Sequence, residues 1–237
     1  MHFLVTRPEE DAAALAEQLR AAGHDVTVDP LLTIHIDKDA PLTRARVQAL
    51  LVTSANGLRA LLARGDVAEW TDLPLLAVGP TTAALARDAG FADVREAGGD
   101  VVSLTGLAAE TLDPDGGPLL HLAGTVTAGD LKQALEEKGF WVERAVLYDA
   151  KAADALSPAT VDALKAGALD GVLLYSRRSS EIFLHLIEAA GLANTLSNVQ
   201  AYCLSANAAA PLQSEGFKAI HVASAPNETE LLTLIAS

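Results

Sequence analysis

Residues 50–57 read Leu-Leu-Val-Thr-Ser-Ala-Asn-Gly, a short apolar run followed directly by small polar residues. Such an apolar run is typical of a strand buried on both faces of a parallel sheet, and small polar residues are typical of helix starts. Residues 172–179, Val-Leu-Leu-Tyr-Ser-Arg-Arg-Ser, have the same form. A second strand-to-helix turn follows each copy, at Gly79 and at Ser205, and a Gly-Phe pair lies 11 residues after the start of each turn. The two stretches therefore indicate an internal repeat.

A shorter repeat accompanies each long one. One helical pattern ends at Gly23, and the apolar segment after it extends to Leu32. Another ends at Gly139, and its segment extends to Tyr148, so both separations are 9 residues. The chain therefore alternates short, long, short and long units. Two copies of one small α/β domain explain this order most simply, and chance similarity among α/β segments is the alternative.

Short apolar runs alternate with segments of helical period along the whole chain. This alternation predicts an α/β architecture in which right-handed crossovers connect parallel strands. The segments around residues 32–34 and 145–150, which leave the two short units, are expected to pair as a two-stranded ladder between the domains. The other predicted strands lie at residues 3–5, 26–28, 49–52, 75–78, 119–122, 171–175, 199–204 and 219–222.

Composition excludes several classes of protein. The 237 residues include 17 Lys and Arg against 31 Asp and Glu, a net charge of −14, which argues against a general nucleic-acid-binding protein. The single Cys203 excludes an internal disulfide and a zinc site built from several cysteines. The N-terminus lacks the pattern of a signal peptide, and polar residues interrupt the longest uncharged stretch. We expect a soluble, cytoplasmic protein without a membrane segment, and a monomer because no apolar surface stripe is evident.

Six polar turns follow predicted strands, and parallel sheets bind ligands at this carboxyl edge. The turns lie at residues 6–8, 53–56, 79–82, 123–125, 176–179 and 205–207. Free backbone N–H groups at helix starts, aided by the helix dipole, attract anions without a net positive charge. The set favours a ligand with several negative groups, although helix capping explains each turn alone more simply. Arg7 is the best candidate for contact with a carboxylate or phosphate, and a solvated surface arginine is the alternative.

Missing motifs restrict the chemistry. The sequence contains no G-x-G-x-x-G after a strand, no G-K-[ST] and no G-x-S-x-G, and its six histidines are scattered. We therefore expect neither a metal nor a cofactor, and an enzyme that acts by holding its substrate in shape. Tyr148 lies where the second short unit leaves its domain. A phenol with the ordinary pKa of about 10 can serve there as a general acid at neutral pH, and an aromatic that fills the face of the ladder is the alternative.

These residues resemble the uroporphyrinogen-III synthase family. The resemblance rests on the order and spacing of short stretches at residues 5–8, 30–32, 53–57, 77–83, 146–148, 175–176 and 222–226. It implies two flavodoxin-like, parallel-sheet lobes joined by a two-stranded β-ladder linker. One lobe would contain residues 1–33 and 153–237, and the other residues 38–147. Residues 34–37 and 148–152 would form the linker strands.

The resemblance also implies a reaction and a set of site residues. The family consists of cyclising hydro-lyases that convert hydroxymethylbilane, a linear tetrapyrrole with many carboxylates, to uroporphyrinogen III with loss of water and inversion of ring D. Tyr148 matches the family's cleft tyrosine, which assists departure of the hydroxymethyl hydroxyl. The polar positions that hold acetate and propionate groups are matched by Ser54, Thr82 and Ser176. The turn that contains Asn207 departs from the family's Gly-Pro-Thr-Thr-like turn, so Asn207 or backbone groups would replace a hydroxyl contact there.

Two other classes of function remain open at this point. A non-catalytic, two-lobed binding or sensor protein for a small polyanionic ligand would use the same duplicated lobes, because a fold does not decide a function. A small transferase would need a nucleotide motif, which the sequence lacks.

Overall fold

The chain forms two compact units in the computed structural model, which describes residues 1–126 and 129–235. Unit 1 contains Met1–Thr33 and Lys151–Ser237, and unit 2 contains Ile34–Ala150. Unit 1 is thus built from both ends of the sequence, and unit 2 from its middle. Each unit is an α/β fold around a sheet of parallel strands, which confirms the predicted fold class.

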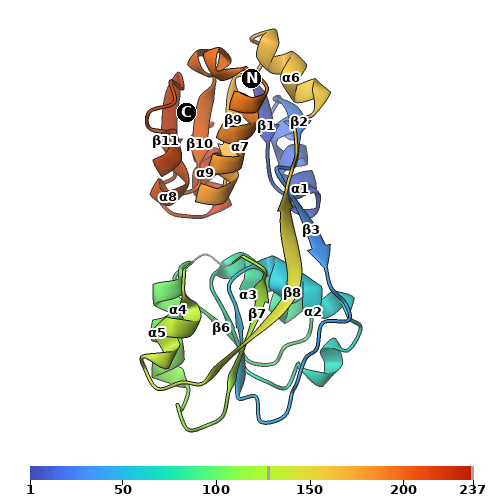
Figure 1. Cartoon of the computed structure of the whole chain (residues 1–237), viewed down its shortest axis with the longest axis vertical. Coiled ribbons are helices and arrows are strands. Elements are labelled where there is room, and N and C mark those ends of the chain that lie inside the picture. Colours follow the sequence, from blue (N-terminus) through green and yellow to red (C-terminus); the bar gives the residue numbers. More distant parts are fainter. Residues whose placement is uncertain (127–128, 236–237) are drawn as a thin grey trace. The chain divides into compact units, whose positions relative to one another are not determined.

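Unit 1 contains a five-stranded parallel sheet with the order β11-β10-β9-β1-β2 (Figure 1). The strands are β1 (His2–Val5), β2 (Asp25–Val28), β9 (Gly171–Leu174), β10 (Gln200–Cys203) and β11 (Ala219–Val222). The α-helices are α1 (Glu9–Ala21), α6 (Pro158–Lys165), α7 (Arg177–Ala189), α8 (Ala206–Ala209) and α9 (Glu228–Thr233). α8 is shorter than expected and passes into a 3-10 turn at Ala210–Leu212, where Pro211 has no N–H to continue the helix.

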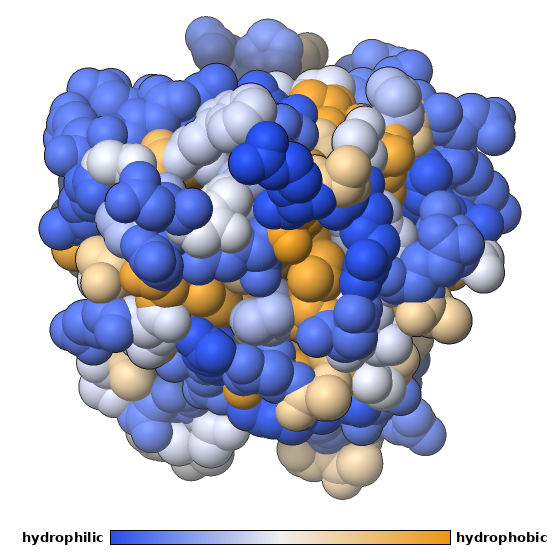
Figure 2. All heavy atoms as spheres, turned by 90° about the horizontal axis from the view of Figure 1, so that it is seen from below, coloured by the Kyte–Doolittle hydropathy of each residue, from blue (hydrophilic) through white to orange (hydrophobic). Residues whose placement is uncertain are grey.

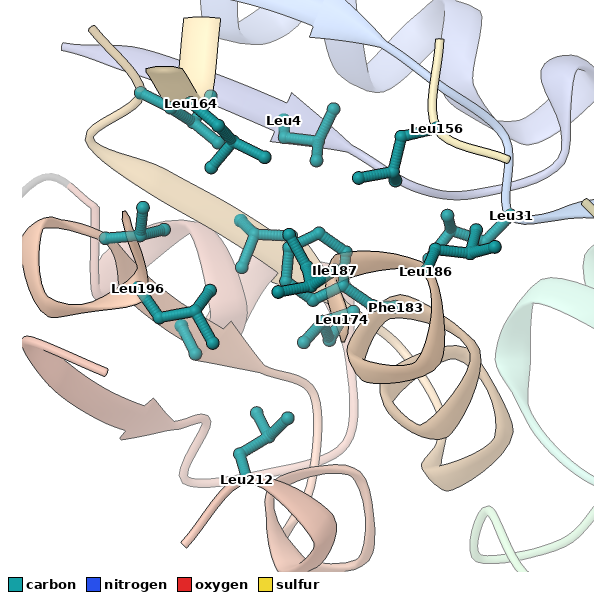
Figure 3. Packing of buried hydrophobic residues seen from close by; sticks show 14 of the residues in the cluster. Leu4, Leu31, Leu156, Leu164, Leu174, Phe183, Leu186, Ile187, Leu196 and Leu212 are labelled. Carbon is teal, nitrogen blue, oxygen red and sulfur yellow. The ribbon is translucent and has the colours of Figure 1, made fainter. Parts of the chain in front are cut away.

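Helices cover both faces of this sheet. Neighbouring residues of a strand point to opposite faces, so each strand contributes side chains to both cores. Leu4 packs with Phe183 of α7 on one face, and Phe3 packs with Leu15 of α1 on the other. Figure 3 shows part of the first cluster, in which the apolar side of α7 lies close to the strands. Burial on both faces of the sheet explains why residues 3–5 of β1 and 172–174 of β9 are apolar throughout rather than alternating.

The second sheet has six strands in the order β3-β8-β7-β4-β5-β6. They are β3 (Leu32–Ile36), β4 (Ala49–Val52), β5 (Leu75–Ala77), β6 (Val94–Glu96), β7 (Leu119–Gly124) and β8 (Val142–Ala152). The α-helices of unit 2 are α2 (Ala55–Ala63), α3 (Pro80–Asp88), α4 (Val101–Thr111) and α5 (Leu131–Glu136). Leu50 and α2 share one core, and Leu51 and α4 share the core on the opposite face.

The two sheets have the same topology, which confirms the internal repeat. The order β6-β5-β4-β7-β8 corresponds to the order β11-β10-β9-β1-β2. The registers also match, because Leu51 lies opposite His121 in unit 2 and Leu173 lies opposite Val5 in unit 1. Residues separated by 122 positions at the start of the long units (51 and 173), or by 116 in the short units (5 and 121), are therefore equivalent.

The two short units end differently: β2 and β3 are separate strands, whereas β8 is continuous. In unit 1 the strand conformation is interrupted after β2, at Asp29 and Pro30, and β3 follows. The equivalent part of unit 2 is the single long strand β8. Pro30 lacks an N–H, and the buried Asp29 turns its carboxylate to the start of α6. That carboxylate accepts hydrogen bonds from the Ser157 N–H (2.8 Å) and the Thr160 hydroxyl (2.6 Å).

β3 and β8 are hydrogen-bonded neighbours, which confirms the predicted two-stranded ladder. The N–H of Ala153 donates to the carbonyl of Leu31 (3.0 Å), and the N–H of Asp37 donates to the carbonyl of Leu147 (2.8 Å). The partner number falls as the residue number rises, so these two strands run antiparallel, unlike the other strand pairs.

The apolar half of the composition lies mainly inside the two units. Figure 2 shows one face of the molecule, which is mostly hydrophilic with small hydrophobic patches. Exposed large apolar side chains include Val102, Val126 and Trp141. Within residues 1–126 and 129–235, no helix is both long enough and apolar enough to cross a bilayer.

Candidate functional site

The three predicted site residues of unit 1 lie at the carboxyl edge of its sheet. Arg7 follows β1, Ser176 follows β9 and Asn207 follows β10, and these three strands are neighbours. Ligands of open α/β sheets bind at this edge, above all where the strand order reverses. In unit 1 this switch point lies between β9 and β1, so it brings Arg7 and Ser176 to adjacent strand ends.

Arg7 belongs to a cluster of charged and aromatic groups. Its Nη1 lies 2.6 Å from Oε2 of Glu228, and its Nη2 lies 3.3 Å from Oδ2 of Asp11. The guanidinium carbon lies 4.4 Å from the centroid of the Tyr175 ring. The Tyr175 hydroxyl donates to the same Glu228 oxygen over 3.1 Å. The solvated-arginine alternative is therefore wrong, and a ligand carboxylate has to join or displace the carboxylates that already bind Arg7.

Burial and neighbouring charges determine the protonation states in this cluster. Burial alone would lower the pKa of Arg7, but Asp11, Tyr175 and Glu228 together raise it. Burial, assisted by the charge of Glu228, raises the pKa of the Tyr175 phenol. Arg7 is therefore a cation and Tyr175 a neutral hydrogen-bond donor at neutral pH. The aromatic ring next to the guanidinium adds a cation–π attraction.

Sequence reasoning missed most of this cluster. Glu228 lies 221 positions after Arg7, at the start of α9, and no motif marks it. Asp11 was the available signal, because it lies four residues after Arg7 in the first turn of α1. Tyr175 ends a predicted strand and belongs to a stretch that carries the resemblance, but its ring contact with Arg7 depends on the pairing of β1 with β9.

Ser176 and Asn207 have different surroundings. The Ser176 hydroxyl accepts a hydrogen bond from the Ser179 N–H (3.1 Å), and the Ser179 hydroxyl accepts one from the Ser176 N–H (3.0 Å). The two serines thus form a capping box at the start of α7. Asn207 is exposed on the short α8. The structure supports the capping interpretation of Ser176, and ligand contacts by either residue stay predictions.

Ser54 and Thr82 lie at the carboxyl edge of unit 2. Ser54 follows β4 and caps α2, because its hydroxyl accepts a hydrogen bond from the Asn56 N–H (3.2 Å). Thr82 lies in the first turn of α3, after the neighbouring strand β5. Only 4% of the Thr82 surface is exposed, so little of its side chain is accessible to a ligand.

Tyr148 lies in β8, one strand away from the switch point of unit 2. Its partner across the β7–β8 ladder is Gly124, the last residue of β7. The N–H of Thr125 donates to the carbonyl of Tyr148 over 3.0 Å. The strand order reverses between β7 and β4, so the half-buried Tyr148 lies beside the same sheet edge as Ser54. The structure thus brings Tyr148 and Ser54 to one edge of unit 2.

A neutral histidine lies next to this edge. His121 of β7 is buried, and its Nε2 lies 3.0 Å from the Thr53 hydroxyl. Burial, with a smaller effect from the charge of Arg144, lowers the pKa of His121 to about 4. His121 is therefore uncharged at neutral pH, and its hydrogen bond to Thr53 joins β7 to the turn after β4.

The described residues offer neither a cluster of metal ligands nor a reactive thiol. Within residues 1–126 and 129–235, no three side chains of His, Cys, Asp or Glu are grouped so that they could hold a metal ion. Cys203 is buried, and this burial raises the pKa of its thiol to about 12. The thiol is therefore protonated at neutral pH and is a poor nucleophile.

Comparison with known proteins supplies the family. The family model described as uroporphyrinogen-III synthase HemD matches residues 13–233. The crystal structure of uroporphyrinogen-III synthetase from Helicobacter pylori is similar over 100% of this chain and 99% of that chain, with 20% identity and a TM-score of 0.68. A mutant uroporphyrinogen III synthase from Thermus thermophilus is similar over 100% of this chain and 98% of that chain, with 18% identity and a TM-score of 0.59.

These comparisons have different weight. At such low identity the two solved structures show a shared fold. A search of curated proteins gives no match. The family model covers nearly the whole chain, from within α1 to the end of α9, and so includes every predicted site residue except Arg7. The chain therefore belongs to the uroporphyrinogen-III synthase family.

Proposed function

We propose that the chain catalyses the reaction of its family, the cyclisation of hydroxymethylbilane to uroporphyrinogen III, and that Tyr148 assists loss of water. The observation that supports this assignment of residues is their common location. Tyr148, Ser54 and Thr82 lie at the carboxyl edge of one sheet, and the other three predicted residues lie at the equivalent edge of the other sheet. The family match favours this enzyme over a non-catalytic binding protein.

The substrate is held through its carboxylates. The helices α2, α3 and α7 begin at this edge in their units, and the first N–H groups of a helix have no partner within it. These donors, with the positive end of each helix dipole, bind carboxylates locally despite the net charge of −14. Arg7 adds the cation of unit 1, where a substrate carboxylate competes with Glu228. Ser54, Ser176 and Asn207 contribute side-chain hydrogen bonds.

The chemical step needs little acid assistance. The electron pair of the terminal pyrrole nitrogen expels the hydroxyl of the hydroxymethyl group, the C–O bond breaks, and an azafulvene forms. The Tyr148 phenol donates its proton to the departing hydroxyl, which leaves as water, and the phenolate recovers a proton when the pyrrole nitrogen loses one. General acid assistance of this kind is worth about a hundredfold or more in rate.

The identity of the product depends on restraint of the substrate. Unaided closure of the linear tetrapyrrole gives the uninverted isomer, so the protein has to hold ring D for attack at its substituted carbon. The bond from that carbon to the bridge of ring C then breaks, and the bridge carbon bonds to the free carbon of ring D, which loses its proton. Fixing a flexible substrate in one reactive shape accelerates one closure over the other without a further catalytic group. Neither a metal nor a cofactor is needed for the steps proposed here.

The test is an assay of the product isomers. The purified chain is incubated with freshly prepared hydroxymethylbilane, the product is oxidised, and the porphyrin isomers are separated. We expect the type III isomer with the native chain and the uninverted isomer with heat-denatured chain as the control. Only the uninverted isomer in both samples would contradict the proposed function.

We also propose that the chain acts as a monomer in the cytoplasm and binds neither nucleic acid nor a membrane surface. The net charge of −14 supports both exclusions, because nucleic acids and anionic lipids repel it. Light scattering during size-exclusion chromatography tests the oligomeric state, and a mass near twice 24.6 kDa would contradict a monomer.

A further inference from the structure

A β-bulge determines where the Tyr148 side chain lies. Ala123 of β7 pairs with Val146 of β8, but the next residue, Gly124, pairs with Tyr148, so Leu147 is an extra residue in β8. A bulge of this kind lets two consecutive side chains lie on one face of a sheet. Both Leu147 and Tyr148 accordingly pack against the core formed by β4, β5 and α2. Without the bulge, Tyr148 would lie on the opposite face.

The absence of a side chain at Gly124 leaves the space that the Tyr148 ring occupies. A Cβ atom built on Gly124 would lie 2.7 Å from Cε2, 2.8 Å from Cζ and 3.2 Å from Cδ2 of that ring. The carbon Cζ carries the phenolic oxygen, so the conflict lies at the end of the ring that would meet a substrate. Any residue larger than glycine must therefore move the phenol.

Neighbouring hydrogen bonds hold the backbone of Gly124 in place. The guanidinium of Arg144 donates to the carbonyl of Gly124 and, over 2.8 Å, to the carbonyl of Thr125. The Thr125 hydroxyl donates to the carboxylate of Asp149, which is the residue after Tyr148. Contacts on both sides of Gly124 and Tyr148 thus fix the end of β7 against β8, so the ring rather than the backbone has to yield to an added side chain.

We propose that Gly124 is a positioning residue for the reaction, because its missing side chain sets the place of the Tyr148 phenol. This inference rests on the proposed role of Tyr148 as the proton donor. Displacement of a proton donor by about 1 Å slows a reaction by up to about a hundredfold, whereas binding of the distant substrate carboxylates is unaffected.

The first experiment measures kcat and KM of Gly124→Ala. We expect kcat to fall by about ten- to a hundredfold and KM to change by less than about twofold. Gly106→Ala is the matched control, since Gly106 lies in α4 of the same unit and an added Cβ there would have open space. Both kinetic constants of the control are expected to stay near those of the unchanged chain.

The second experiment tests whether the loss acts through the ring. In a Tyr148→Ala background the space is open, so Gly124→Ala should cause no further loss of kcat. Fluorotyrosine labelling gives an independent signal, because the chain contains only three tyrosines. The fluorine resonance of Tyr148, assigned with Tyr148→Phe, should shift in Gly124→Ala, and those of Tyr175 and Tyr202 should not. Should Gly124→Ala alone fail to fold, restored folding in the double variant would give the same evidence of conflict.

The outcomes separate this inference from the proposed function. If Tyr148→Ala keeps the kcat of the unchanged chain, Tyr148 is not the proton donor and the proposed function of this residue fails. If Tyr148→Ala lowers kcat but Gly124→Ala does not, the positioning role of Gly124 is wrong and the role of Tyr148 stands. The positioning role would also be overturned if Gly124→Ala lowered kcat further in the Tyr148→Ala background. An unshifted fluorine resonance of Tyr148 in Gly124→Ala would overturn it as well.

Discussion

The carboxyl edges of the two units have the same strand order but different chemistry. At the switch point of unit 1, Arg7 is stacked on Tyr175 and paired with Glu228. At the switch point of unit 2, Thr53, equivalent to Tyr175, is hydrogen-bonded to the neutral His121. One edge is thus built around a paired cation and the other around hydroxyl groups, a neutral imidazole and a glycine.

This difference suggests how a duplicated fold divides its work. Both units have helix N-termini at the carboxyl edge, α2 in unit 2 and α7 in unit 1. Their attraction for carboxylates comes from backbone N–H groups, so it does not depend on particular side chains. The side chains at the switch points depend on single residues and are free to diverge. We infer that unit 1 contributes mainly to binding of the acidic substrate and unit 2 mainly to the chemical step. The predictions below test this division and the packing that maintains it.

The largest expected effect is the acid sensitivity of unit 2. His121 has a pKa of about 4 when folded, below the ordinary value of 6.5, so the unfolded chain binds a proton first as the pH falls. The free energy of unfolding should therefore fall between pH 6.5 and pH 4, by about 3 kcal/mol in total. In His121→Gln this part of the pH dependence should disappear, as measured by urea unfolding at several pH values.

The control for this prediction is His185→Gln, which replaces an exposed histidine of α7 in unit 1. This variant retains His121, so the fall in the free energy of unfolding between pH 6.5 and pH 4 should remain. The equivalent of His121 in unit 1 is Val5, which does not titrate, so hydrogen exchange at pH 5 should increase more in β7 than in β1. Equal increases in both strands would remove His121 as the cause.

A smaller effect is expected from Gly57→Ala in α2. A Cβ atom at Gly57 would lie 2.5 Å from the carbonyl oxygen of Leu122 in β7, and a backbone atom of a central strand cannot move aside easily. We expect thermal or urea unfolding to show a loss of about 2 kcal/mol. The equivalent residue of unit 1 is Ser179, which accommodates a side chain at the start of α7.

Gly106→Ala again serves as the control for Gly57→Ala, and it should stabilise the chain by up to about 1 kcal/mol because alanine favours a helix. Equal stability of the two variants would show that α2 is not packed as closely on β7 as the structure indicates.

The smallest effect concerns the serines that cap α7 and α2. Ser176→Ala removes one half of a capping box and should lower the free energy of unfolding by about 1 kcal/mol. Ser54→Ala removes a single, longer hydrogen bond of 3.2 Å and should cost about half as much. Urea unfolding of the two variants measures the difference. A larger loss of unfolding free energy from Ser54→Ala than from Ser176→Ala would contradict the expectation that the capping box stabilises its helix more than the single hydrogen bond does.

Much of the fold was predictable because the strands are buried on both faces. Runs such as residues 49–52 and 75–78 are apolar throughout, and their order gave the repeat that the sheet registers confirm. β6 was missed because Val94 is followed by two charged residues at the sheet's edge. The residues alone also left open which short unit joins which long unit, because that pairing depends on contacts between distant segments.

The candidate site was predictable only in part. The polar turns that contain Arg7, Ser54 and Ser176 were predicted because a strand end followed by polar residues is a local signal, and the binding roles of these residues stay predictions. Glu228 was not found, because its contact with Arg7 joins opposite ends of the chain. The bulge at Leu147 was not found either, because one extra residue leaves no mark in the sequence of β8 and becomes visible only in the register with β7.

The division of work between the two edges is tested most directly by kcat and KM of Arg7→Ala and Tyr148→Phe, measured side by side with Arg87→Ala as the control. Arg87 lies in the last turn of α3, away from the carboxyl edge, and should alter neither constant. We predict that Arg7→Ala raises KM by about tenfold with little change in kcat. Tyr148→Phe should lower kcat by about ten- to a hundredfold, keep KM, and still yield some type III product. A loss of kcat alone in Arg7→Ala together with a rise of KM alone in Tyr148→Phe would contradict the account.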